Sequence, residues 1–173
     1  MLYGYNACTL AYYIIEHNLG IREQYEFLQA VYREENAFLL RKYQNDESLF
    51  YNEIRYAINM FCASDDNCSV MLSLPKHDES EIALQEKLLE MSAEDIVFQI
   101  LRLEIKYGLK RAYKCMKLRT LLALYGYKRR SDSIVRYIEK QMLLYHLGVF
   151  RNGECVNIWD VPLDAMLTFK ILC

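Results

Sequence analysis

The chain has 173 residues, of which 53% are hydrophobic and 25% are charged, and its formal net charge at pH 7 is −2. This length suits one domain or two small ones, and the apolar fraction is ample for a folded core. No run approaches the roughly 20 apolar residues that a membrane span requires, and the first residues lack the basic segment of a signal peptide. The sequence therefore predicts a soluble intracellular protein, cytoplasmic or nucleoid-associated, with no membrane partner.

The N-terminal half is predicted to be a helical bundle. Only two prolines and six glycines interrupt the whole chain, and this scarcity favours long helices. Gly20 is a typical stop for the first helix, and Asn45 or Asp46 can cap a later one. The turn-rich segment from Ser64 to Pro75 is the best candidate for a linker. The predicted helices are Asn6–Asn18, Ile21–Tyr43 and Glu47–Phe61, followed by a short one after Asp78.

A helix is also predicted from about Ser92, because Ser92 with Asp95 resembles a capping box and apolar residues follow at helical spacing. Gly108 leaves two alternatives. If the helix continues, five basic residues at steps of three and four form one stripe; if it ends, the stripe splits into two patches. These residues are Arg102, Lys106, Lys110, Lys114 and Lys117.

The next segment is typical of a short helix, a turn and a longer helix. The short helix is predicted over Lys117–Leu124, with Gly126 after its end. Ser131 is placed to cap the longer helix, Asp132–Leu147, which Gly148 should end. Helical spacing predicts that the longer helix buries Ile134, Ile138, Met142 and Tyr145.

A hairpin is predicted next. Asn152-Gly153 stands between two β-prone runs and favours a two-residue turn in which Arg151 faces Glu154. After the hairpin, Pro162 is expected to begin a last helix that runs to Leu172.

Charge divides the chain. Residues 1–92 contain 7 Lys and Arg against 15 Asp and Glu, whereas residues 93–173 contain 14 against 8. Within residues 102–130, ten basic side chains stand against Glu104 alone. A concentrated basic patch beside a turn and a helix is the electrostatic footprint of a nucleic-acid binder. The alternative is that two unlike helical faces are merely solvated or attract each other. We therefore expect two domains, an acidic one at 1–92 for dimerisation or partner binding and a basic one at 93–173.

No catalytic or metal-binding motif stands out. His17, His77 and His146 have no cysteine or carboxylate partners at an interpretable spacing, and the six cysteines form no CxxC pair. We expect reduced thiols, with a Cys62–Cys68 disulfide as the alternative. The sequence predicts a non-enzymatic protein that has no metal and no cofactor.

The residues after position 108 support a resemblance. The pattern is carried by Leu121, Leu122, Ala123, Gly126, Ile134, Val135, Ile138, Leu147, Gly148 and Asn152-Gly153. Over residues 109–160 this order resembles the winged helix-turn-helix superfamily, although Lys128-Arg129-Arg130 makes the turn longer than the tightest examples. In that superfamily the helix after the turn enters the major groove. The resemblance implies a mainly α fold, with an N-terminal helical bundle followed by a winged-helix-like region and one small β-hairpin.

The resemblance also implies a function, namely sequence-directed binding to double-stranded DNA in transcription or replication control. The N-terminal bundle would form a homodimer or hold a protein partner. The alternative is a non-enzymatic protein-interaction module, an adaptor or inhibitor whose basic surface meets an acidic protein. The implied DNA-binding residues are Lys114, Lys117, Lys128, Arg129, Arg130, Ser131, Ser133, Arg136 and Arg151.

Overall fold

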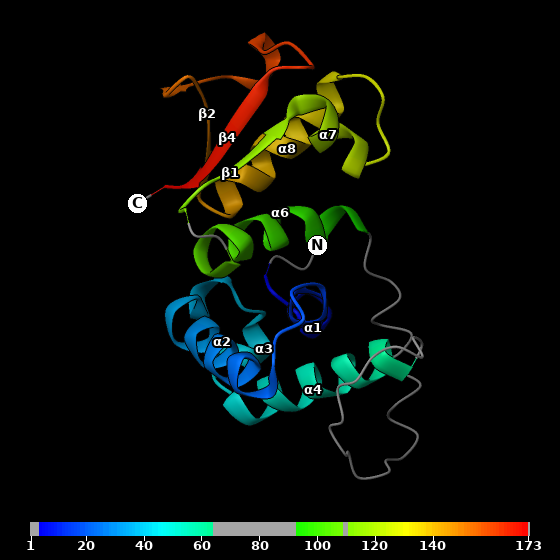
Figure 1. Cartoon of the computed structure of the whole chain (residues 1–173), viewed down its shortest axis with the longest axis vertical. Helices are drawn as coiled ribbons and strands as arrows, with labels where there is room; N and C mark the ends of the chain where they lie inside the picture. Colours follow the sequence, from blue (N-terminus) through cyan, green and yellow to red (C-terminus); the bar gives the residue numbers. More distant parts are fainter. Residues whose placement is uncertain (1–3, 64–92, 109–110, 173) are drawn as a thin grey trace. The chain divides into compact units, whose positions relative to one another are not determined.

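The computed structural model describes residues 4–63, 93–108 and 111–172. The chain divides into two compact units, residues 1–92 and 93–173. Within the described residues helices predominate, and a four-stranded antiparallel sheet accompanies them (Figure 1). The prediction of a mainly helical fold is confirmed. The predicted linker at 64–75 and the helix after Asp78 lie outside the described residues.

The N-terminal unit is helical throughout its described part. Asn6 begins α1 as a cap, since its side-chain oxygen accepts a hydrogen bond from the Thr9 amide at 2.9 Å. Asp46 caps α4 in the same way, accepting from the Leu49 amide at 2.8 Å. The helix α1 packs against α4, and the core includes Leu10, Ile14, Phe50 and Ile54. The elements are α1 (Ala7–Glu16), α2 (Ile21–Glu34), η1 (Asn36–Phe38), α3 (Arg41–Gln44) and α4 (Glu47–Ala63).

The predicted helix over Ile21–Tyr43 is wrong beyond Glu34. Glu35 is only 1% exposed and accepts a hydrogen bond from the Tyr5 hydroxyl at 3.1 Å. Tyr5 also pairs with Leu39 as an isolated β-bridge. These contacts with Tyr5, which is 30 residues before Glu35, stabilise a non-helical path for the chain after Glu34. The spacing of apolar residues within the segment could not indicate them.

The C-terminal unit alternates helices and strands. Its helical elements are α6 (Ala93–Leu103), a π-helical turn η2 (Glu104–Gly108), α7 (Leu118–Leu124), α8 (Asp132–Leu144) and η3 (Ile158–Asp160). Its strands are β1 (Lys114–Lys117), β2 (Leu147–Arg151), β3 (Glu154–Cys155) and β4 (Met166–Ile171), and their order in the sheet is β1-β4-β2-β3.

One face of this sheet forms the core of the unit with the helices. Leu167 and Phe169 of β4 are fully buried, whereas Thr168 between them is partly exposed and Met166 and Lys170 on either side are exposed. This alternation is the period of a strand with one buried face. Leu121 and Ile138, from α7 and α8, are also fully buried. Figure 1 shows the helices on one side of β1, β2 and β4.

Two predictions for this unit are wrong. The last helix predicted from Pro162 is the strand β4, because the apolar residues Leu167 and Phe169 recur every second position. The long helix ends at Leu144, and Gly148 is buried within β2 and does not act as a stop. His146 takes the left-handed conformation there, at φ 48°. The predicted single hairpin is therefore part of a larger sheet.

Candidate nucleic-acid interface

The turn between α7 and α8 starts with a glycine-dependent helix end. Gly126 has φ 74°, and its amide bonds to the Ala123 carbonyl at 2.9 Å while the Tyr127 amide bonds to Leu122 at 3.0 Å. This pair of bonds is a Schellman motif, in which glycine accepts the left-handed backbone without strain. The motif turns the chain sharply. Lys128 and Arg129 follow it as exposed side chains.

Arg130 differs from its two basic neighbours. It is only partly exposed, and one terminal nitrogen of its guanidinium donates to the carbonyls of Ile158 and Val161, each at 2.8 Å. Those carbonyls belong to the segment that returns from the hairpin toward β4. Arg130, which is among the implied DNA-binding residues, therefore holds this segment against the turn.

Ser131 and the helix α8 present the surface that the sequence singled out. The Ser131 hydroxyl caps α8, accepting from the Ile134 amide, and lies 3.1 Å from the Ser133 hydroxyl. The core side of α8 is lined by Ile134, Val135, Ile138, Gln141 and Met142. Its exposed side carries Ser133, Arg136 and Lys140, at steps of three and four.

Acidic residues balance the basic ones on α8. Asp132 and Glu139 are exposed on the same helix as Arg136 and Lys140, so the helix has no formal net charge. The positive charge near α8 comes instead from the preceding turn. Lys140 was not among the predicted site residues, although its spacing of four from Arg136 could have indicated it.

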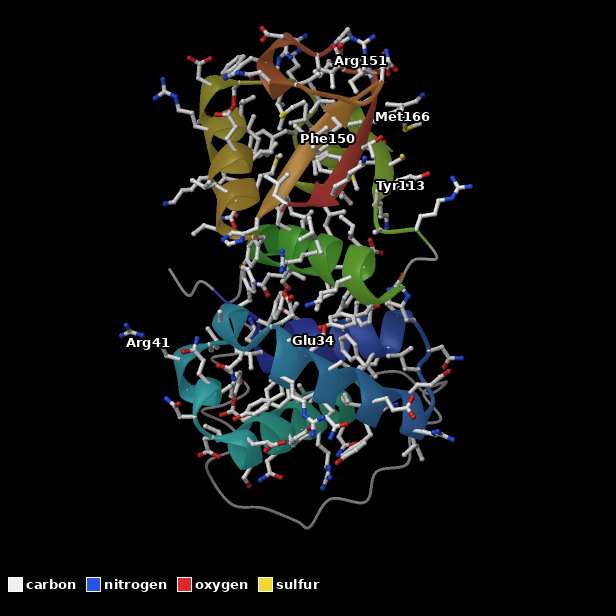
Figure 2. All side chains as sticks on the ribbon, turned by 90° about the vertical axis from the view of Figure 1, so that its left-hand side faces the viewer. Glu34, Arg41, Tyr113, Phe150, Arg151 and Met166 are labelled. Atoms are coloured by element: carbon white, nitrogen blue, oxygen red, sulfur yellow. The ribbon has the colours of Figure 1, made fainter. Side chains whose placement is uncertain are left out.

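The hairpin has the predicted turn. Asn152 and Gly153 have φ values of 52° and 90°, as a type I′ turn requires, and Arg151 pairs with Glu154. Arg151 is exposed at the end of β2, beside the tip of the hairpin (Figure 2). Direct pairing with Glu154 offsets part of its charge.

The structure disperses most of the basic cluster between residues 102 and 130. Gly108 ends η2 and Lys114 begins a strand, so the basic stripe is split. Arg102 is 5% exposed and donates to the Tyr145 carbonyl at 2.7 Å. Lys114 forms an ion pair with Glu104. Lys110 lies outside the described residues.

Lys114 and Lys117 are also far from the hairpin within the sheet. Both lie on β1, at the opposite edge of the sheet from β3. Nearby, Arg119 donates two hydrogen bonds to the Asp164 carboxylate in a bidentate ion pair, at 2.8 and 2.9 Å. These hydrogen bonds lower the pKa of that carboxyl. The predicted site residues thus fall into two places: a group around α8 and the hairpin, and a pair on β1.

In the described part of the chain, no group of three or more His, Cys, Asp or Glu residues could hold a metal ion. No helix there is both long and apolar enough to cross a bilayer. The expectation of reduced thiols is wrong for Cys62, which is disulfide-bonded, whereas Cys8, Cys115 and Cys155 are free.

Comparison with known proteins identifies no relative for this chain: no protein-family model, no curated protein and no solved structure matches it.

Proposed function

We propose that residues 93–173 form a winged helix-turn-helix that binds double-stranded DNA, and that the protein is a regulator of transcription or replication. The observation that carries this proposal is the order of elements. A short helix, a glycine turn and a longer helix are followed by a strand, an Asn-Gly hairpin and a returning strand. This order leaves the outer side of α8 exposed, with basic residues in the turn before it and at the hairpin after it.

Each basic residue has a distinct role in this proposal. Arg136 and Ser133, in the first half of α8, face base edges in the major groove, where arginine can pair with guanine and serine can bond to bases or phosphates. Lys128 and Arg129 contact phosphates, which give affinity without sequence information. Arg151 reaches a phosphate or the minor groove from the hairpin. Ser131 and Arg130 hold the helix and the hairpin in place.

The N-terminal unit supplies the dimer contact in this proposal, since most helix-turn-helix proteins bind paired half-sites as dimers. Ile21 and Tyr25 are 68% and 59% exposed on α2. The Tyr25 ring stacks beside Tyr51 of α4, with centroids 6.1 Å apart. Arg22 and Glu26, on the same helix, form an exposed ion pair with each other at 2.8 Å.

A specific observation favours the rival function, a protein-interaction module. The helix α8 has no net charge, and Leu143 on it is 77% exposed. An exposed apolar residue on a neutral helix suits a protein groove better than a phosphate backbone.

Titration with a fluorescent mixed-sequence duplex of about three helical turns separates the two functions. The intact protein should bind at low salt, and its affinity should fall linearly on a log–log plot against salt concentration. A triple variant with alanine at Lys128, Arg129 and Arg136 should lose most of this binding. A matched control removes three exposed basic residues of the other unit, Arg33, Arg41 and Lys42, and should keep it. No binding by the intact protein at low salt would refute the proposal in favour of the interaction module.

A further inference from the structure

The sheet has an outer face that points away from the core of its unit. Strand alternation and register place a row across all four strands on this face: Cys115 pairs with Thr168, Thr168 with Phe150, and Phe150 with Cys155. Beside the row lie Lys117, Met166 and Lys170. Figure 2 shows Phe150 over the strands, with Tyr113 and Met166 nearby, on the side away from α8.

An aromatic ring lies near the centre of this face. Phe150 is partly exposed, and its ring lies close against Gly148: a Cβ added to Gly148 would come within 2.9 Å of the Phe150 ring and 2.7 Å of the Leu172 side chain. The glycine therefore makes room for the ring to rest on the sheet. The Lys170 ammonium lies 5.2 Å from the ring centroid. Such cation–π contacts are weak at exposed sites, so the ammonium can move aside at little cost.

The surroundings of the ring are apolar at the centre and basic at the rim. Met166 is 54% and Leu172 is 47% exposed. Lys117 and Lys170 are exposed around them, and Arg111 bonds to the Tyr113 hydroxyl at 2.8 Å just before β1. Among the described strand residues on this face, none is acidic. This charge distribution is complementary to a polyanion with flat apolar groups.

We propose that the outer sheet face binds unpaired nucleotides of a single-stranded nucleic acid. One base stacks on Phe150, Lys170 moves from the ring to a neighbouring phosphate, and Lys117 contacts the backbone on the β1 side of the ring. Stacking on an aromatic side chain tolerates any base, because every base has a π-face, and a basic groove supplies the remaining affinity. This surface is separate from the one proposed for duplex DNA, so either proposal can fail alone.

The test uses the full chain and three fluorescent probes: oligodeoxythymidylate, oligouridylate and a blunt-ended DNA duplex, which has no unpaired bases. Phe150→Leu keeps an apolar side chain on Gly148 but has no π-face, and it should weaken binding to the single strands by about tenfold. Phe150→Trp should retain the affinity. Lys170→Gln should lower the salt dependence by about one phosphate contact. A matched control, Tyr127→Leu, removes another exposed ring of the same unit and should change nothing.

The relative affinity for the two single strands identifies whether DNA or RNA is the natural source, and either preference supports the site. Binding of single strands without binding of the duplex would refute the proposed function and leave this inference standing. The inference is overturned if the intact protein binds neither single strand at low salt. It is equally overturned if Phe150→Leu binds both single strands as tightly as the parent.

Discussion

The guanidinium of Arg130 lies 5.7 Å from the centroid of the Trp159 ring. Arg130 also donates to the carbonyls of Ile158, at the start of η3, and Val161, just after its end. Since Arg130 immediately precedes the Ser131 cap, these contacts link η3 to the start of α8. The link joins two parts of the chain that are nearly 30 residues apart. The start of α8 and the return from the hairpin are thereby held as one piece.

We expect Arg130→Ala to destabilise the protein by about 1–3 kcal/mol, because it leaves two carbonyl groups without their donor. Thermal unfolding followed by circular dichroism measures the change. Arg129→Ala is the matched control, since Arg129 is the exposed neighbour in the same turn and its loss should leave the unfolding midpoint nearly unchanged. Equal stability of the two variants would contradict the fastening role.

Gly153→Val should destabilise the hairpin by about 1–2 kcal/mol, since a β-branched residue resists the positive φ of the turn. No heavy atom lies within 4 Å of an added Cβ at Gly153, so the cost comes from the backbone alone. Gly153→Asn is the control, because asparagine tolerates the left-handed region and should cost much less. Chemical denaturation of both variants measures the difference, and similar midpoints would exclude a backbone origin.

Features that depend on local chemistry were predictable from the sequence. The stop at Gly126, the Ser131 cap and the Asn152-Gly153 turn each follow from one or two residues and their backbone preferences. The sequence predicted four buried residues on the long helix, and all four are buried in the structure: Ile134, Ile138 and Met142 on α8, and Tyr145 at its C-cap. These elements define the proposed site.

Features that depend on distant partners were not predictable. Arg102 finds the Tyr145 carbonyl 43 residues later, and Arg119 finds Asp164 45 residues later. A count of basic residues assumes that every basic side chain can bind a polyanion, although Arg102 and Arg119 already form hydrogen bonds within the protein. The strand β4 was missed for a different reason, because Pro162 suggested a helix start and masked the alternation that follows it.

The ion pair between Arg119 and Asp164 predicts a pH dependence. Its hydrogen bonds lower the pKa of Asp164 below the ordinary value of 3.8, so the stabilisation is present above that pH and is lost as the pH falls through the lowered pKa. Arg119→Gln should raise the Asp164 pKa toward its ordinary value, as carboxyl NMR titration can measure. The small stability difference between parent and variant should vanish in acid. An unchanged Asp164 pKa would show that the pair does not persist in solution.

The division at residue 92 predicts that residues 93–173 fold alone. The fragment should keep a helical circular dichroism spectrum and a cooperative thermal transition, because residues 93–173 form a compact unit of their own. If the N-terminal unit dimerises, the fragment should bind DNA more weakly than the intact chain and sediment as a monomer. An unfolded fragment would show that the two units depend on a shared core.

Arg136 and the turn residues should respond differently to alanine substitution. Lys128→Ala and Arg129→Ala should each weaken binding to all duplexes alike and lower the salt slope by about one, because phosphate contacts carry no sequence information. Arg136→Ala should cost about 1–3 kcal/mol on a selected preferred site and less on other sequences, if it reads a guanine. Titrations at several salt concentrations, with Arg33→Ala on α2 as the control, distinguish the two patterns. A folded triple variant of Lys128, Arg129 and Arg136 that binds as tightly as the parent would exclude α8 and its turn as the contact.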